Sequence, residues 1–267
     1  MQYPDFEIID FHTHPFEADA DNICSHKECC DMSEEHILRD LSAVGIRRFC
    51  GSVIRVGRDV RDYPTPWSMI LAHNDAALRL RDRFGGRYIP GFHVHPGCVK
   101  ESMEEIERMH RAGVNLIGEL VPYLDEWGTG YDDPRLSGIL DLAEEYGMVV
   151  SIHSMGEDEM DRMVRAHPRL TVVAAHPGEY GEFLRHMERM KFSENYYLDT
   201  SGYGIFRHGM LRHAIDLVGA ERILFGSDYP TCNPAMYVGG VLLDPLLTDR
   251  EKELIFAGNA KRLLGLH

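Results

Sequence analysis

Four histidines and one aspartate stand at the ends of short apolar runs in this chain. The first pair, His12 and His14, follows the run 8–11. The others follow three later runs and are His153, His176 and Asp228. Neutral imidazole and carboxylate are ligands of zinc, iron and manganese, and a site that keeps one coordination position open is catalytic. The sequence therefore predicts a metal enzyme.

The first pair can serve one ion. His12 and His14 are two residues apart on an extended segment, so both side chains project from the same side of the strand. Asp10 has the same parity and is a candidate to support these ligands. For an isolated pair of this kind, two ordinary loop histidines are an equally good interpretation. The recurrence of ligand-type residues at the ends of later runs favours metal ligation.

A further carboxylate, Glu119, follows the apolar run 114–118. Barrel hydrolases often use a carboxylated lysine at this point to bridge two metals. The chain has no lysine between Lys100 and Lys191, so that ligand is excluded here. Glu119 is then the candidate bridging ligand, and an acid held in an ion pair or behind the ligands is the alternative.

Asp228 has the clearest mechanistic role. A carboxylate beside a metal can hold the water on that metal and take its proton, and later return the proton to a leaving group. A divalent ion lowers the pKa of such a water from about 15.7 to about 7. The alternative for Asp228 is a structural cap of the loop that begins at Tyr229.

The elements that position these residues alternate regularly. Apolar, β-branched runs stopped by Pro or Gly predict eight buried parallel strands, at 8–11, 48–54, 88–94, 116–121, 148–152, 170–175, 196–199 and 223–225. Segments of helical periodicity follow them near 33–45, 67–84, 101–112, 134–147, 157–166, 180–190, 208–218 and 248–264. We expect residues 1–267 to form a single (β/α)8 TIM barrel, with all ligands at its catalytic face; an open doubly wound sheet is the alternative.

Composition limits the partners. The length of 267 residues suits one such barrel, which typically has about 250. The net charge of −15 argues against nucleic acid and anionic membranes as partners and leaves a small molecule, with a homo-oligomer as an open possibility. No signal peptide, membrane-spanning run or secreted disulfide spacing is visible, so we expect a cytoplasmic protein.

Three other groups are candidates for binding. His93 and His95 form a second pair, with His95 expected to contact substrate and His93 to be packed or hydrogen bonded. Arg55, and its neighbours Arg58 and Arg61, follow the second strand and suit an anionic substrate, with surface ion pairing as the alternative. A separate zinc site in the first loop, from Cys24, His26, Cys29 and Cys30, has no zinc-finger spacing, so reduced cysteines are expected there.

Together these motifs resemble the amidohydrolase superfamily. The resemblance rests on His12-Thr-His14, the strand-end His153 and His176, Gly226-Ser-Asp228-Tyr-Pro and the terminal Gly258-Asn-Ala-Lys-Arg-Leu-Leu. It is to the amidohydrolase-related (amidohydrolase family 2) branch, which includes hydrolases and nonoxidative decarboxylases. It implies a metal set of His12, His14, His153 and Asp228, with His176 on a second metal or the substrate. Gly118-Glu119 and Ile152-His153-Ser154 also resemble TatD-related hydrolases, which use a strand-four Glu as ligand.

The leading hypothesis is a metal-dependent hydrolase of a small, anionic organic substrate. It would hold one or two divalent ions, with zinc favoured over manganese or iron, on His12, His14, Glu119, His153, His176 and Asp228. The first alternative is a metal-dependent nonoxidative decarboxylase of an unsaturated or aromatic acid. The second is a noncatalytic metal-containing barrel that only binds.

Overall fold

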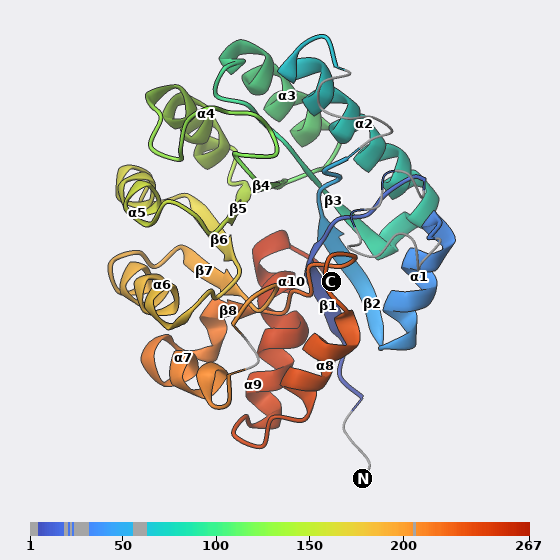
Figure 1. Ribbon diagram of the computed structural model, residues 1–267, viewed down its shortest axis with the longest axis vertical. Coiled ribbons are helices and arrows are strands. Elements are labelled where there is room, and N and C mark those ends of the chain that lie inside the picture. The colour runs from blue at the N-terminus through green and yellow to red at the C-terminus, as the bar shows by residue number, and fades with distance from the viewer. Residues whose placement is uncertain (1–4, 19–20, 22, 24–31, 56–62, 205–206) are drawn as a thin grey trace.

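Eight parallel strands form the centre of the molecule, ordered β1 to β8 round the sheet (Figure 1). The structure is a computed structural model that describes residues 5–18, 21, 23, 32–55, 63–204 and 207–267. The strands are β1 (Ile8–Thr13), β2 (Ile46–Gly51), β3 (Tyr88–Phe92), β4 (Leu116–Leu120), β5 (Val149–His153), β6 (Thr171–Ala175), β7 (Tyr196–Asp199) and β8 (Ile223–Leu224).

Backbone hydrogen bonds close the sheet on itself. The amide of Phe11 donates to the carbonyl of Phe225 at 2.8 Å, and the amide of His14 donates to the carbonyl of Tyr229 at 2.7 Å. The first strand is thereby joined to the segment after the eighth. The predicted (β/α)8 barrel is confirmed, and the open sheet is excluded.

Helices α1 to α9 stand outside the strands, and α10 lies nearer the middle of the ring (Figure 1). They are α1 (Glu34–Ala43), α2 (Pro66–Phe84), α3 (Val99–Arg111), α4 (Pro134–Glu145), α5 (Glu157–Ala166), α6 (Tyr180–Phe192), α7 (Met210–Val218), α8 (Pro234–Leu242), α9 (Asp249–Glu253) and α10 (Asn259–Leu264). Short turns η3 (Gly85–Arg87) and η4 (Ala220–Arg222) precede β3 and β8, and the π-helical segment η5 (Leu254–Gly258) joins α9 to α10. Within the described chain, no helix combines the length and apolar character needed to cross a bilayer.

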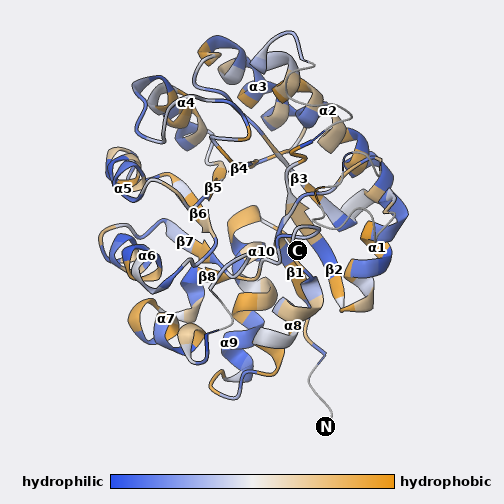
Figure 2. Cartoon of the chain, viewed as in Figure 1, coloured by the Kyte–Doolittle hydropathy of each residue, from blue (hydrophilic) through white to orange (hydrophobic). Residues whose placement is uncertain are grey.

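Helix α4 illustrates why these segments fold as they do. The side chain of Asp133 accepts a hydrogen bond from the amide of Arg135, and Pro134 occupies the first turn, where its missing N–H costs nothing. The buried residues recur at helical spacing and are Leu136, Ile139, Leu140 and Ala143. One face of the helix therefore packs on the barrel while the other meets solvent. The helices accordingly carry hydrophobic and hydrophilic residues side by side (Figure 2).

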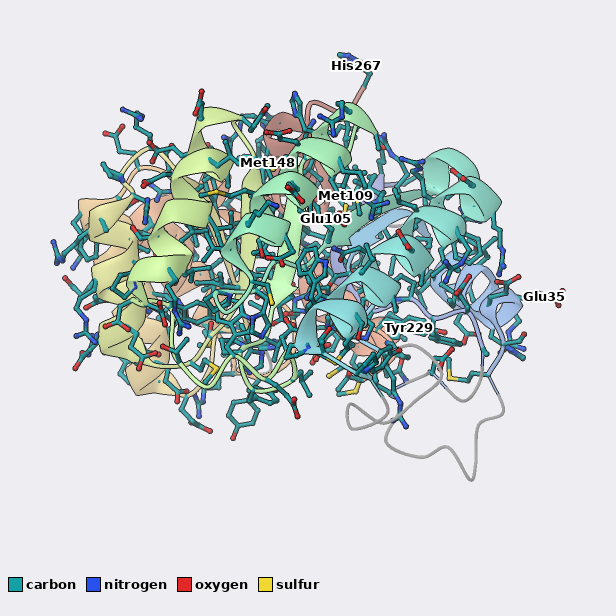
Figure 3. All side chains as sticks on the ribbon, turned by 90° about the horizontal axis from the view of Figure 1, so that it is seen from above. Glu35, Glu105, Met109, Met148, Tyr229 and His267 are labelled. Atoms are coloured by element: carbon teal, nitrogen blue, oxygen red, sulfur yellow. The ribbon has the colours of Figure 1, made fainter. Side chains whose placement is uncertain are left out.

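A small separate core fills the barrel. It is formed by alternate strand residues and by residues after β8, among them Ile9, Phe11, Leu116, Val149, Val173, Leu224 and Ala257. The end of the chain packs against it through Leu263, Leu264 and Leu266. Figure 3 shows Met148, just before β5, and His267 at one end of the barrel, and Tyr229 at the other. The interior is therefore packed toward the amino ends of the strands, which leaves the carboxyl ends for a site.

Two elements differ from the sequence prediction. Helix α8 was missed because its Gly239-Gly240 pair has low helix propensity; Asn233, which accepts from the Ala235 amide, starts it. The expected helix at 248–264 is divided by η5, whose wider turn interrupts the α-helical pattern.

Candidate active site

The six predicted ligands converge at the carboxyl ends of the strands. The Nε2 atoms of His12 and His14 lie 3.1 Å apart, so the pair does project to one side. Glu119 Oε2 is 3.4 Å from both of these nitrogens. Asp228 Oδ1 is 3.8 Å from Nε2 of His12 and 3.5 Å from Nε2 of His14. Strands β1 and β4 and the segment after β8 thus bring carboxylate oxygens of Glu119 and Asp228 to the same pair of imidazole nitrogens.

The other oxygen of Glu119 faces a second group of donors. Its Oε1 atom is 3.0 Å from His153 Nδ1 and 3.5 Å from His176 Nε2. The two imidazole rings are in edge contact, with centroids 4.8 Å apart. Glu119 therefore stands between the His12–His14 pair and the His153–His176 pair, with one oxygen toward each.

The spacing of the first group fits a metal ion. A tetrahedral ion that holds nitrogen or oxygen donors at about 2.1 Å places those donors about 3.4 Å apart. The two Nε2 atoms of His12 and His14 lie 3.1 Å apart, and each lies 3.4–3.8 Å from an oxygen of Glu119 and of Asp228, so these separations scatter round that value. Two three-residue sets qualify on geometry, one of His12, His14 and Asp228 and one of His12, Glu119 and His176.

The electrostatics of the site also favour a cation. Burial opposes a charge on His12, yet the carboxylates of Glu119 and Asp199 raise the pKa of His12 well above its usual value. Burial likewise opposes the charge on Glu119, but His12 and the hydrogen bonds from the histidines hold the pKa of Glu119 well below its usual value. Buried carboxylates in this arrangement need positive charge among them, which a divalent ion supplies.

Sequence reasoning missed the residues that orient the histidines. His12 Nδ1 lies 2.8 Å from Oδ2 of Asp199, at the end of β7, which leaves Nε2 for an ion. The hydroxyl of Ser201 is 3.0 Å from Nδ1 of both His12 and His176. Asp199 could have been found in the sequence, because it is an acid at the end of an apolar run, which is the pattern that identified Asp228.

Two further contacts support the site. His14 Nδ1 lies 3.1 Å from the carbonyl of Ser52, so its Nε2 atom also faces the site centre. Asp10 accepts hydrogen bonds from the amide and the hydroxyl of Ser227, at 2.9 and 2.5 Å, and burial raises its pKa to about 7. Asp10 therefore holds the turn that leads into Asp228.

Backbone conformation aims two of the side chains. His176 and Asp228 have φ angles of 66° and 60°, in the left-handed region that residues with a Cβ rarely occupy. The neighbouring Gly202 is required by packing, because a Cβ there would lie 2.2 Å from His176 Nδ1. His176 follows β6 directly and Asp228 lies in the turn after β8, and these strained positions turn both side chains toward the barrel mouth.

A cavity of about 420 Å³ opens beside these groups. His153, His176 and Asp228 form part of its wall, and its other lining residues include Ser154, Glu182, Tyr203 and Cys232. Tyr123, 59% exposed, stands edge-on to the ring of His153, with centroids 5.4 Å apart. The volume suits one small organic molecule.

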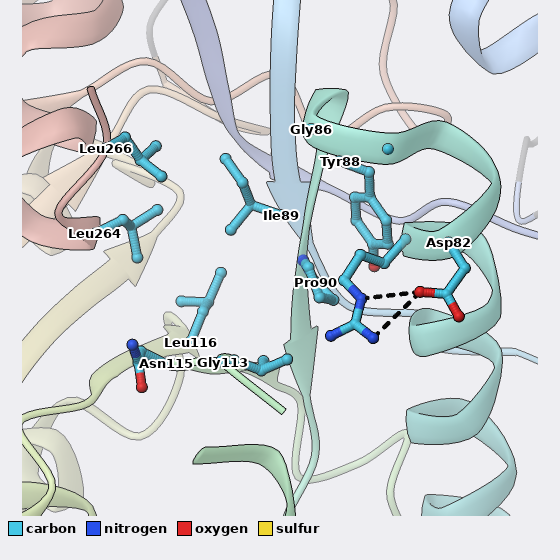
Figure 4. Close-up of a pocket in the computed structure, with 13 residues that line it drawn as sticks. Asp82, Gly86, Tyr88, Ile89, Pro90, Gly113, Asn115, Leu116, Leu264 and Leu266 are labelled. Atoms are coloured by element: carbon cyan, nitrogen blue, oxygen red, sulfur yellow. Dashed lines mark hydrogen bonds and ion pairs between the residues drawn. The ribbon is translucent and has the colours of Figure 1, made fainter. Parts of the chain in front are cut away.

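A second cavity, of about 440 Å³, lies at the opposite end of the barrel (Figure 4). It is lined at the amino ends of β3 and β4 by apolar residues such as Ile89, Leu116 and Leu266, and the Arg81–Asp82 ion pair lies at its side. The described residues that line it include no histidine. Catalytic groups of such barrels lie at the other end, so this cavity is not the candidate active site.

The remaining predicted contacts are placed as follows. His93 is buried and hydrogen bonded, with Nδ1 3.1 Å from Asp125 Oδ2 and Nε2 3.0 Å from the carbonyl of Val53, as expected. His95 is buried against Trp127 and is not among the residues found to line the mouth cavity. Arg55 is exposed in the segment after β2. Arg58, Arg61 and the Cys24, His26, Cys29 and Cys30 cluster lie outside the described residues.

A histidine–carboxylate cluster at the mouth of a (β/α)8 barrel defines a class of metal-dependent enzymes. The chain belongs to the amidohydrolase family, whose model matches residues 9–266. It is a metal-dependent enzyme of the amidohydrolase superfamily, as the sequence resemblance indicated. No curated protein matches the sequence significantly.

Several solved structures share the fold. A 2,6-dihydroxybenzoate decarboxylase from Rhizobium is 18% identical, with a TM-score of 0.75 over 97% of this chain and 99% of that one. A 5-carboxyvanillate decarboxylase from Sphingomonas paucimobilis is 17% identical, with a TM-score of 0.71 over 98% and 100%. A dihydroxybenzoic acid decarboxylase from Polaromonas, with bound manganese and the inhibitor 2-nitroresorcinol, is 16% identical, with a TM-score of 0.71 over 97% of each chain.

These comparisons correct the leading functional hypothesis. The expected hydrolase assignment is wrong, because the structural neighbours are mainly decarboxylases, which matches the first alternative instead. The physical reason for the error is that hydrolases and decarboxylases of this superfamily share the ligand pattern on which the assignment rested. The preference for zinc is not confirmed either, since a neighbour holds manganese.

Proposed function

We propose that the protein is a metal-dependent nonoxidative decarboxylase of an aromatic or unsaturated carboxylic acid. The observation that carries this proposal is the placement of His153, His176 and Asp228 on the wall of one cavity of about 420 Å³. The cavity suits a single substituted ring. The similarity of the whole barrel to decarboxylases supports the same reaction.

The chain's own donors divide into two groups in this proposal. His12, His14, Glu119 and Asp228 would hold a first divalent ion, because an oxygen of each carboxylate lies within 3.8 Å of both imidazole Nε2 atoms. His153 and His176 face Glu119 from the cavity side and would contact the substrate or a second ion. When bound, the ion would supply Lewis-acid chemistry that withdraws negative charge from substrate oxygens. We propose Zn²⁺ or Mn²⁺, both of which accept imidazole and carboxylate ligands.

Asp228 would handle the proton of the reaction. Nonoxidative decarboxylation breaks the bond between the ring carbon and the carboxyl carbon, releases CO₂ and leaves the electron pair on the ring carbon. That carbon takes one proton, so no oxidant is required. Asp228 Oδ1 faces His12 and His14 while the residue also lines the cavity, so its carboxyl group reaches both the ligands and the substrate. Solvent restores the proton to Asp228 after CO₂ leaves.

Arg55 is the proposed contact for an anionic substituent of the substrate. It is exposed in the segment after β2, whose carboxyl end faces the same side of the barrel as the ligands. A guanidinium binds a carboxylate through two parallel hydrogen bonds, which fixes orientation as well as charge.

The test is a search for CO₂ release from a panel of hydroxybenzoates. The protein is loaded with Mn²⁺ or Zn²⁺ and incubated in D₂O, and the product is examined by mass spectrometry and NMR. The proposal requires CO₂ and one deuterium at the carbon that lost the carboxylate, with neither formed by chelator-treated protein. Metal-loaded protein that releases no CO₂ from any member of a broad panel of aromatic and unsaturated acids would contradict the proposal.

A further inference from the structure

Behind the cavity, a chain of buried polar groups runs from Ser154 into the barrel wall. Ser154 follows His153 and lines the cavity. Its hydroxyl contacts the carbonyl of Ala175 and lies 3.3 Å from Nε2 of His186. The other ring nitrogen of His186, Nδ1, lies 2.7 Å from the hydroxyl of Tyr196. The residue after β5, helix α6 and strand β7 therefore contribute one member each to a single hydrogen-bonded line.

The direction of each hydrogen bond follows from the chemistry of these groups. The Tyr196 phenol is buried, and its hydroxyl carries one proton that it can donate. Within the described chain, His186 Nδ1 is the acceptor found for the Tyr196 hydroxyl. Tyr196 then donates to Nδ1, which places the imidazole proton on Nε2.

The hydroxyl proton of Ser154 also has a defined acceptor. The Ser154 hydroxyl donates to the Ala175 carbonyl, which can only accept. His186 Nε2 lies 3.3 Å from the Ser154 oxygen, and the His186 ring also hydrogen bonds to the backbone of His176. A serine hydroxyl has one proton and two lone pairs. Its proton is therefore committed to the protein, and the oxygen of this cavity-lining residue keeps a lone pair that can accept a further hydrogen bond.

From this polarity we infer that Ser154 is a specificity-determining residue that accepts a hydrogen bond from a hydroxyl group of the substrate. The inference rests on the proposed function and narrows its substrate class to hydroxylated acids. His186 is a positioning residue, since it acts on the substrate only through the Ser154 oxygen. The neighbouring carboxylates of Glu182 and Asp228 also line the cavity and disfavour a second anionic group beside Ser154, whereas a neutral hydroxyl is compatible with them.

The experiment compares two ligands on matched variants of the metal-loaded protein. Calorimetry measures binding of 2,6-dihydroxybenzoate and of benzoate, which lacks both hydroxyl groups, to the wild type and to Ser154→Ala. One neutral hydrogen bond lost from a buried site weakens binding roughly 3- to 10-fold. We expect that loss for 2,6-dihydroxybenzoate and unchanged affinity for benzoate, so the ligand selectivity falls by the same factor.

Ser137→Ala is the matched control. Its hydroxyl lies 3.0 Å from Nε2 of His167, so it removes a similar serine–histidine contact at a position that does not line the cavity. We expect it to leave both affinities at the wild-type level. Circular dichroism and metal content confirm that each variant is folded and loaded.

The outcomes separate the two proposals. If the wild type binds both ligands and Ser154→Ala weakens them equally or not at all, the inference about Ser154 is wrong and the decarboxylase proposal stands. If the wild type binds neither ligand and releases no CO₂ from the wider panel of acids, the proposed function fails and the inference fails with it. A loss of affinity for 2,6-dihydroxybenzoate but not for benzoate, seen in Ser154→Ala and absent in Ser137→Ala, supports the inference.

Discussion

Asp199 and His12 are joined by a hydrogen bond of 2.8 Å between Oδ2 and Nδ1, which links the end of β7 to the end of β1. Both residues are buried, so solvent does not compete for the bond. Asp199 also receives a hydrogen bond from Ser201, whose hydroxyl lies 3.0 Å from Nδ1 of His176. One carboxylate therefore orients a predicted ligand directly and influences a second one through Ser201.

Asp199→Asn tests this arrangement. An amide oxygen still accepts a hydrogen bond but lacks the charge that makes the imidazole a strong ligand, so we expect metal affinity to fall about 10- to 100-fold. Competition with a chromophoric chelator measures the change. Asp141→Asn is the control, because Asp141 pairs with His167 Nδ1 at 3.2 Å on the surface. Equal metal affinities in both variants would show that Asp199 does not support the metal site.

Removing the first histidine pair should abolish metal binding. The double variant His12→Ala/His14→Ala takes away the two imidazoles that lie within 3.8 Å of both Glu119 and Asp228, and the remaining carboxylates cannot close the coordination sphere. Elemental analysis after dialysis should show at least a tenfold lower metal content, while the exposed His110→Ala keeps the wild-type content. Full metal retention by the double variant would overturn the assignment.

Asp228→Asn separates ligation from proton transfer. The amide oxygen can still approach an ion, but an amide is neither a useful acid nor a base, so we expect most of the metal to remain while kcat falls about 10²–10⁴-fold. Steady-state CO₂ release and metal content are measured on the same preparation. A near-normal kcat would show that another group supplies the proton.

Arg55→Lys tests recognition of an anionic substituent. Lysine keeps the charge but loses the paired donors of the guanidinium, so KM should rise roughly 3- to 10-fold with little change in kcat. Arg111→Lys, which alters an exposed helical ion pair with Glu107, serves as the control. Unchanged kinetics in Arg55→Lys would mean that Arg55 is only a surface charge.

Two buried histidines should make the fold sensitive to acid. Burial lowers the pKa of His73 to about 4 and that of His186 to about 3, below the value of about 6.5 in the unfolded chain. Between the folded and the unfolded pKa, the unfolded state binds more protons than the folded state. The contribution of the two neutral histidines to the free energy of unfolding is therefore complete above about pH 6.5 and is lost as the pH falls. At pH 5 each histidine should lower the free energy of unfolding by on the order of 2 kcal/mol.

Urea unfolding of metal-free protein at pH 7 and pH 5 measures this effect without contributions from metal release. His73→Gln should lose less stability than the wild type between the two pH values, because glutamine does not titrate. The exposed His110→Gln should follow the wild type. A wild-type difference that His73→Gln fails to reduce would contradict the pH assignment for His73.

Much of the barrel was predictable because its signals are local. A strand such as β5 is a mostly apolar run rich in β-branched residues, and α4 shows a capping residue, an initial proline and helical spacing, so neither depends on distant residues for recognition. Helix α8 was missed for the converse reason. Its glycine pair disfavours a helix locally, and packing of Tyr237, Val238 and Val241 against the barrel stabilises it.

The reaction class was not predictable from the ligands. The set that includes His12, His14 and Asp228 is shared by hydrolases and decarboxylases, so it identifies a metal enzyme without distinguishing the bond that is broken. That choice depends on the cavity wall, to which residues such as Ser154 and Tyr203 come from separate loops. Loop shape is a property of the folded chain and has no periodic pattern in the sequence.

The candidate ligands could therefore be identified from the sequence. Alternate residues of a strand point to the same side, and a closed parallel barrel places the ends of all its strands on one face. The bond between His12 and Asp199 could not be identified in this way, because it spans 187 positions and exists only once β1 and β7 lie in the same barrel. The contacts of Glu119, whose two oxygens face different histidine pairs, likewise exist only in the folded barrel. Which donors share a point in space is decided by the closure of the sheet and by the turns after its strands.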